Sequence, residues 1–225
     1  MKRRQLLTRI SAALVCRQFP AWAVDTSMPA EPVGVKAHLD LAKATKIRAQ
    51  FLANQAQQAN DEGLGGEELD LSAYSSASLA ALACLRPLNG SFATLGFETI
   101  TPEMARVLSD WKTYFLCFGR LQNLEQEAAC YLGNAENAHG LDFAWPMALT
   151  AATAKAVAGN GAPLHLALQA APDLPCAKAL AAHTHELYLT WPDGNIEPSV
   201  ARALSLHAGY LLQLTMSNRP LQALL

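Results

Sequence analysis

The sequence has few charged residues and no long uninterrupted apolar run. Asp, Glu, Lys and Arg make up 16% of the 225 residues, whereas hydrophobic residues make up 51%. The best N-terminal apolar patch is interrupted by Arg17, and no stretch reaches the roughly 18 to 20 uncharged apolar residues that a membrane-spanning helix requires. The composition therefore argues against an integral membrane span. It predicts a chain that buries a core in one elongated domain, or in a domain with an arm.

The sequence also lacks cysteines at metal-ligand spacing. Its five cysteines are Cys16, Cys84, Cys117, Cys130 and Cys176. None forms a Cys-x-x-Cys pair, and none lies near two histidines at the spacing of a zinc site. We therefore expect no metal and no cofactor, and we interpret the later cysteines as buried free thiols.

The N-terminal residues have the pattern of an export signal. A basic stretch at residues 2–4 precedes an apolar patch at residues 10–15, and residues 21–23 form a small-x-small cleavage site. We predict that residues 1–23 are a signal peptide and that the protein is periplasmic, secreted or surface-associated. The arginine pair has a twin-arginine form. The alternatives are a misassigned start, a disordered basic tail, or a lipoprotein signal at Cys16, which the large residue before it disfavours.

Removal of residues 1–23 would leave an acidic protein. The whole chain has 17 Lys and Arg against 19 Asp and Glu, and the segment holds five basic and no acidic residues, which leaves 12 against 19 and a net charge of −7. This excess of negative charge argues against nucleic acid or an anionic membrane surface as the partner.

A short linker and a helix precede the main part of the chain. Residues 24–34 contain two prolines and a glycine among small residues, which is typical of a linker. Residues 35–60 carry scattered apolar residues with no internal Gly or Pro, and a turn signal follows at residues 61–63. We assign residues 35–62 to an N-terminal helix that caps the domain after it. The alternative is a scaffold in which this helix is the interaction element.

A two-part motif repeats through residues 63–225. The first part is an apolar-x-apolar pair, typical of a strand with one buried face. The second part, about thirteen residues later, is a small or apolar residue followed three positions on by an aliphatic residue, which is typical of a helix. The strand pairs are Leu69/Leu71, a second pair that begins at Phe92 or Leu95, Leu116/Phe118, Leu141/Phe143, Leu164/Leu166, Leu187/Leu189 and Leu212/Leu214. The helix pairs are Leu82/Leu85, Ala105/Leu108, Ala129/Leu132, Ala154/Val157, Ala177/Leu180 and Ala201/Leu204.

Stacking of the repeated units predicts the fold. Thr101 and Thr150 stand where helix N-caps are expected, and Pro102 occupies a first-turn position. One unit alone buries little, but units stacked in register pair their strands into a parallel sheet with a continuous core. We predict an α/β solenoid of about seven strand-helix units with the parallel sheet on its concave face. A doubly wound sheet would show variable crossover lengths and a glycine-rich turn, which the sequence lacks.

The segment from Leu69 to Leu225 resembles the leucine-rich repeat family, in particular divergent bacterial repeats in which a Leu-x-Leu strand is followed by a Pro-Glu-x-Ala-x-x-Leu helix. The motifs are Leu116-Cys117-Phe118, Leu187-Tyr188-Leu189 and the helical segment 100–111. The family's usual turn asparagine is replaced by Tyr74, Phe97, Leu121, Pro146, Gln169 and Pro192. The resemblance implies a monomeric, non-enzymatic protein that binds a protein or another macromolecule through its concave face.

The same resemblance places the central residue of each strand on the concave face. These residues are Asp70, Ala93 or Gly96, Cys117, Asp142, His165, Tyr188 and Gln213. We predict a binding surface at Cys117, Asp142, His165, Tyr188 and Gln213.

The alternative is a secreted cysteine- or metal-dependent hydrolase, in which Cys117 is the nucleophile, His165 the base and Asp142 lies between them. Cys117 and His165 lie two strands apart, roughly 9 to 10 Å, beyond hydrogen-bond reach. We therefore assign no catalytic residue.

Two aromatic residues and three histidines complete the candidates. Trp145 and Trp191 each precede a proline at the same offset in their units, which predicts two aromatic side chains on one edge. Exposed, they would anchor a partner; buried, they would fill the core, and we expect partial burial. His183, His185 and His207 lie at helix C-termini, where histidine caps the last carbonyls. A metal site at the first two is the alternative, and no nearby residue completes it.

Overall fold

The computed structural model describes residues 37–58, 68–86, 92–134, 140–192, 196–208, 212–216 and 219–220. The chain divides into two compact units, residues 1–34 and 35–225, and every described residue belongs to the second. The predicted signal peptide and linker lie outside the described residues. In the part that is described, no helix has both the length and the apolar character needed to cross a membrane.

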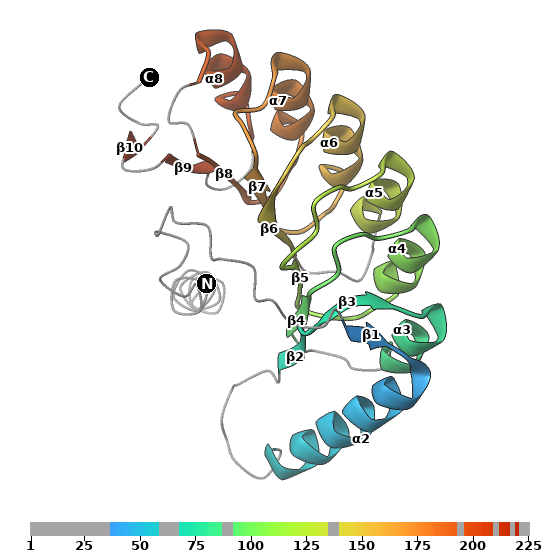
Figure 1. Ribbon diagram of the computed structural model, residues 1–225. Coiled ribbons are helices and arrows are strands. Elements are labelled where there is room, and N and C mark those ends of the chain that lie inside the picture. The colour runs from blue at the N-terminus through green and yellow to red at the C-terminus, as the bar shows by residue number, and fades with distance from the viewer. Residues whose placement is uncertain are drawn as a thin grey trace. The chain divides into compact units, whose positions relative to one another are not determined.

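The second unit is an α/β structure of alternating strands and helices. Its helices are α2 (Leu41–Gln58), α3 (Leu79–Leu85), α4 (Pro102–Ser109), α5 (Gln126–Gly133), α6 (Ala151–Val157), α7 (Leu174–Ala181) and α8 (Pro198–Leu204). Its strands are β1 (Ala37–Leu39), β2 (Glu68–Leu71), β3 (Tyr74–Ala77), β4 (Phe92–Leu95), β5 (Phe115–Phe118), β6 (Leu141–Met147), β7 (Leu164–Leu168), β8 (Leu187–Trp191), β9 (Leu212–Met216) and β10 (Arg219–Pro220). Within this unit the helices α3 to α8 lie on the outer side of a curve and the strands of the main sheet on its inner side (Figure 1).

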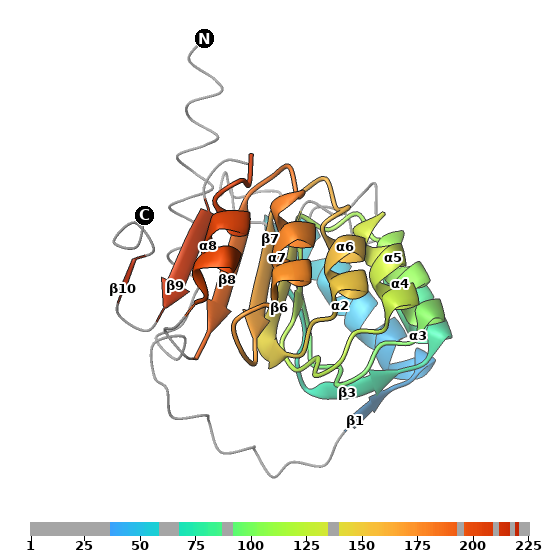
Figure 2. The same cartoon turned by 90° about the horizontal axis from the view of Figure 1, so that it is seen from above.

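The main sheet has eight strands in the order β10-β9-β8-β7-β6-β5-β4-β2. The strands from β2 to β9 are parallel to one another, as the predicted stacking requires. Viewed from above, the helices α3 to α8 follow one another along a single face of this sheet (Figure 2). A parallel sheet of alternating strand-helix units is therefore present, and its stacking is compatible with a solenoid.

The apolar pairs of the sequence form the core of this unit. The helix pairs are all buried, and so are the described strand pairs, except that the version of the second pair that begins at Phe92 is only half-buried. In β4, the strand of this second pair, Ala93 lies opposite Leu69 of β2 and Leu95 lies opposite Leu71. The buried pair is therefore Ala93/Leu95, and both predicted starting points, Phe92 and Leu95, were wrong. Phe92 faces away from the helices, because strand side chains alternate between faces.

Side-chain caps begin most of the short helices. Thr101 accepts a hydrogen bond from the Met104 backbone at 3.3 Å, and Thr150 accepts one from Thr153 at 3.1 Å, as predicted. Ser78 and Asp173 cap α3 and α7 in the same way. Each cap satisfies an N–H that has no partner within the helix, so the repeated helix starts are specified by local chemistry.

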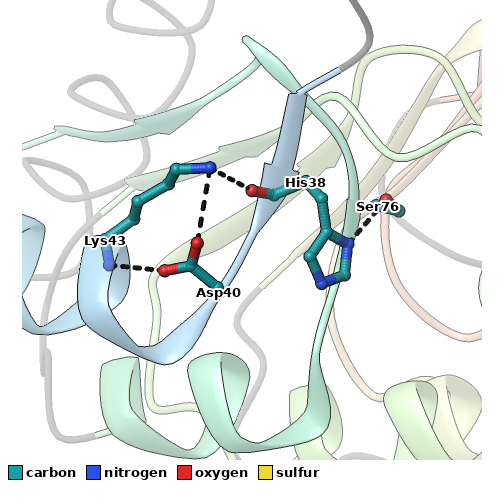
Figure 3. Close-up of polar contacts among 4 residues, drawn as sticks. All are labelled: His38, Asp40, Lys43 and Ser76. Carbon is teal, nitrogen blue, oxygen red and sulfur yellow. Dashed lines mark hydrogen bonds and ion pairs between the residues drawn. The ribbon is translucent and has the colours of Figure 1, made fainter.

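The N-terminal helix begins six residues later than predicted, because residues 37–39 form strand β1 instead. β1 pairs in parallel with β3 in a separate two-stranded sheet. Asp40 then ends the strand, and its carboxylate accepts a hydrogen bond from the Lys43 backbone at 2.8 Å (Figure 3). The Lys43 ammonium donates to the His38 carbonyl oxygen at 2.8 Å, and the His38 ring contacts the Ser76 hydroxyl at 2.9 Å. These contacts fix the start of α2 against β3.

Helix α2 lies at the end of the unit next to β2 (Figure 1). Ala44 and Phe51 are buried, as is Leu39 just before the helix. α2 lies against α3 (Figure 1). Leu41 and Leu52 remain exposed on its other side.

The last unit differs from the prediction of about seven strand-helix units. Strands β4 to β8 are each followed directly by a helix, α4 to α8, and β2 is followed by the short strand β3 and then by α3, which gives six described strand-helix units. In the described part of the chain β9 is followed by β10, which pairs with it antiparallel. Pro220 in β10 has no N–H to offer a further strand, a feature that protects the edge of a sheet.

Candidate functional site

The central residues of the parallel strands form one unbroken row on the sheet face that points away from α3–α8. The row is Asp70, Thr94, Cys117, Asp142, His165, Tyr188 and Gln213. The second member is Thr94, not Ala93 or Gly96 as predicted. Ala93 faces the core, and Gly96 follows the strand, where a β-carbon would overlap the carbonyl oxygen of Ser72. Of Gln213 only the backbone pairing is described.

A second row on the same face was missed by the sequence reasoning. It consists of the residues two positions earlier: Glu68, Phe92, Phe115, Gly140, Pro163 and Glu186. The signal that could have found it is the period of two along a strand, which puts these positions on the face of the first row. We call the two rows together the inner sheet face.

His165 lies between two aromatic rings of the inner sheet face. The Phe115 ring meets it edge-on with centroids 5.3 Å apart, and the Tyr188 ring lies 4.1 Å away. Gly140 makes room for this arrangement, because a β-carbon there would overlap the Phe115 ring. His165 is only 7% exposed, and this burial lowers its pKa to about 4. The imidazole is therefore neutral near pH 7.

Cys117 and Asp142 contact each other on neighbouring strands. The thiol donates to the Asp142 carboxylate with Sγ and Oδ2 3.5 Å apart. Burial raises the pKa of Asp142 to about 6. Burial, and then the nearby Asp142 charge, raise the pKa of the Cys117 thiol far above its ordinary value.

This geometry does not activate Cys117. A nucleophilic cysteine needs a lowered pKa and a base within hydrogen-bond reach. Here a carboxylate stands next to the thiol and favours its protonated form, and the neutral His165 belongs to the strand beyond Asp142. The contact is a polar pair between a half-buried thiol and a buried carboxyl group.

The accessible part of the inner sheet face differs from the predicted site. Asp142 and His165 are buried, with 8% and 7% of their surface exposed. Phe92, Phe115 and Tyr188 are half-buried, and Glu68 and Asp70 are exposed. Thr190, two positions after Tyr188 on β8 and therefore on the same side of the sheet, is exposed as well, and we include it in the inner sheet face. Tyr114, which precedes β5, is 51% exposed, and its ring centroid lies 6.3 Å from that of Phe92. Aromatic rings and carboxylates therefore make up much of what a partner would meet.

The two tryptophans lie within strands and not after them. Trp191 ends β8 and is 4% exposed, so it belongs to the core. Trp145 is half-buried in β6, whose pairing with β7 shifts register between Phe143 and Met147. Only Trp145 of the pair keeps exposed surface for an anchoring role.

The histidines at the helix ends contact carbonyls of the preceding unit. His183 Nδ1 lies 3.1 Å from the oxygen of Ala158, the C-cap residue of α6, and His207 Nε2 lies 2.9 Å from the His185 oxygen. The rings of His183 and His207 are stacked with centroids 6.0 Å apart. Across the described ranges, no three His, Cys, Asp or Glu side chains gather as a metal site would require.

We expect Asp142 and His165 to give opposing pH dependences of stability. The pKa of Asp142 is raised to about 6 in the folded state. Its contribution to folding stability is therefore fully present below the pKa of the unfolded state and is lost as the pH rises through 6. The pKa of His165 is lowered to about 4 in the folded state. Its contribution to folding stability is therefore fully present above the pKa of the unfolded state and is lost as the pH falls through 4. Between pH 4.5 and 6.5 each effect amounts to about 2 kcal/mol, and they largely cancel.

Single substitutions should separate the two effects. Urea denaturation of Asp142→Asn is expected to show stability rising by about 2 kcal/mol from pH 4.5 to 6.5 relative to the unsubstituted chain. His165→Phe should show a fall of similar size. Identical pH profiles for the two variants would contradict the assigned pKa shifts.

The described residues of the inner sheet face form a broad surface that extends over several strands. Half-buried aromatic rings and exposed carboxylates are presented by its successive strands, Cys117 is half-buried, and Asp142 and His165 are buried among them. Comparison of the chain with protein-family models, with curated proteins and with solved structures gives no match.

Proposed function

We propose that the protein is a leucine-rich-repeat-like solenoid that binds another protein, or another macromolecule, through its inner sheet face and catalyses no reaction. The observation that carries the proposal is the unbroken register of one row of strand positions over consecutive parallel strands, from Asp70 on β2 to Tyr188 on β8. Such a row gives a partner several strands to contact at once, and neighbouring strands lie only about 4.8 Å apart.

The aromatic side chains support this role. Phe92, Phe115 and Tyr188 are half-buried, and Tyr114 is half-exposed. Rigid aromatic groups of this kind supply much of the binding energy at protein interfaces, because they bury large areas and lose little conformational entropy. The packing of Phe115 against His165 holds its ring in place before a partner arrives.

The proposal includes a compartment and an assembly state. Residues 1–23 would direct export, so the partner would be met in the periplasm, outside the cell or at its surface. The protein would act as a monomer. The remaining chain, at −7, disfavours nucleic acid as the partner.

The direct test compares capture of a partner by variants of opposite faces. Phe115→Ala with Tyr188→Ala removes two aromatic side chains from the inner sheet face. Arg106→Ala with Glu127→Ala removes two exposed side chains from α4 and α5. Immobilised full-length variants would be incubated with a host cell-surface fraction, and each retained protein would be quantified by mass spectrometry. We expect a specific partner whose retention falls at least about 10-fold with the first pair and is unchanged with the second.

Circular dichroism would establish that both variants keep their secondary structure. Retention that is equal for the unsubstituted chain and the Phe115/Tyr188 variant would rule out the inner sheet face as the binding surface. Retention that is lost only with the Arg106/Glu127 variant would assign binding to the helices instead.

A further inference from the structure

We propose that the partner segment recognised by the inner sheet face is cationic: an extended polypeptide stretch of about seven residues that carries lysine or arginine and lies across the strands from β2 to β8. This inference rests on the proposed function and names the chemistry of the partner.

The first support is the sign of the charges on the inner sheet face. Its ionisable residues other than His165 and Cys117 are Glu68, Asp70, Asp142, Tyr188 and Glu186, and none of its residues is Lys or Arg. Glu68 and Asp70 are exposed at one end of the face, and Glu186 stands at the other. A partner of opposite charge would be steered to this face, whereas an acidic partner would meet like charges.

The basic residues of the helices lie on the opposite side. Arg106, Lys155, Lys178 and Arg202 occupy the last turns of α4, α6, α7 and α8, and all four are exposed. Each directly follows the small residue of its helix pair, so the repeat places all four at the same position of their helices. The helical side thus carries both signs of charge, since Glu103, Glu125 and Glu127 are exposed there too, whereas the described residues of the inner sheet face include carboxylates and no Lys or Arg.

The second support is the position of the carboxylates and the rings between them. The Glu68 carboxylate accepts a hydrogen bond from Thr94 at 3.1 Å, and Glu186 accepts one from the Tyr188 hydroxyl at 3.1 Å. Both carboxylates are thus held by the face itself. The rings of Phe92 and Phe115 stand between the two ends, where they can pack against the stems and charged groups of lysine or arginine.

The distance between the ends sets the length of the segment. From β2 to β8 the sheet order contains five strand-to-strand steps. At about 4.8 Å each, these steps span about 24 Å. An extended chain rises about 3.4 Å per residue, so about seven residues cover the distance. Cationic side chains near both ends of such a segment would meet Glu68 and Glu186.

The test is selection from a displayed library of random heptapeptides on the immobilised full-length chain at low salt. We expect the selected peptides to be enriched in Lys and Arg over Asp and Glu. Synthetic copies should bind Glu68→Lys with Glu186→Lys about 10-fold or more weakly, and binding to the unsubstituted chain should weaken as salt is raised.

The matched control is Glu125→Lys with Glu127→Lys at the start of α5. It makes the same change in net charge through two exposed residues on the helical side. Synthetic peptides should bind this control as well as they bind the unsubstituted chain. An equal loss with both lysine pairs would show that only overall charge matters and would overturn the inference.

The Phe115→Ala/Tyr188→Ala variant distinguishes this inference from the proposed function. Selected peptides that depend on Phe115 and Tyr188, but lack Lys and Arg and tolerate the Glu68/Glu186 reversal, would overturn the cationic inference and leave the proposed function standing. Failure to select any peptide that depends on Phe115 and Tyr188 would count against both.

Discussion

Phe143→Ala is expected to lower the free energy of unfolding by about 3–5 kcal/mol, the largest effect of any substitution considered for this chain. Phe143 is fully buried in the middle strand of the array. Its ring stacks on that of Phe118 in the neighbouring unit, with centroids 5.0 Å apart and planes inclined by 13°. The substitution would therefore remove a contact between two units and leave a cavity that the flanking strands cannot close.

Urea denaturation followed by circular dichroism measures this effect. The control is Phe92→Ala, which removes the same ring from the other face of the sheet, where it is half-buried. We expect the control to lose no more than about 1 kcal/mol. A broken contact between units can also uncouple the two halves of a repeat array, so the transition of Phe143→Ala should broaden. Equal losses for the two variants would contradict the assigned core face.

Gly133→Ala is expected to destabilise the protein by about 2–3 kcal/mol. Gly133 ends α5, and a β-carbon there would overlap the carbonyl oxygen and carbon of Ala156 in α6. Both obstacles are backbone atoms, so the helices must move apart. The sign of the change in unfolding free energy is informative, because replacing a helical glycine by alanine ordinarily stabilises a chain by about 0.5–1 kcal/mol.

Gly161→Ala is the matched control for Gly133→Ala. The atom closest to a β-carbon at Gly161 is Cε1 of His185 at 4.0 Å, an ordinary contact distance. We expect its unfolding free energy to change by less than about 0.5 kcal/mol. Thermal and urea unfolding of the pair would measure the difference. Stabilisation by both substitutions would show that α5 and α6 do not approach each other as closely as described.

The repeated units could be predicted from the sequence because each buried position carries its own local signal. The alternation of Leu141 and Phe143 marks a strand face, and the three-residue interval of Ala154 and Val157 marks a helix stripe. Caps such as Thr150 agree with the periodic pattern, so local chemistry and packing indicate the same boundaries.

The features that the sequence did not reveal depend on contacts between distant segments. Strand β1 is only three residues long, and its partner β3 comes after α2 and β2 in the chain. No local period therefore marks either strand. In β4 the buried positions carry Ala93 and Leu95, and the larger apolar residue Phe92 faces the other way. Only the pairing of Leu95 with Phe118 in the next strand fixes that register.

Candidate site positions were predicted better than their exposure. The period of two placed Cys117, Asp142, His165 and Tyr188 in one row correctly. It could not show that His165 lies between the rings of Phe115 and Tyr188, because that burial arises from three separate strands. Exposed residues such as Glu68 therefore lie outside the row of central residues that the sequence predicted.

Site-specific photo-crosslinking tests the central claim, binding by the inner sheet face, most directly. A benzophenone amino acid would replace exposed Thr190 on β8, or exposed Glu127 on α5, in the full-length chain. Each variant would be irradiated with the partner or with a selected peptide, and the crosslinked fraction measured. The account predicts crosslinking from position 190 and little or none from position 127. Crosslinking from position 127 alone, or equally from both positions, would contradict it.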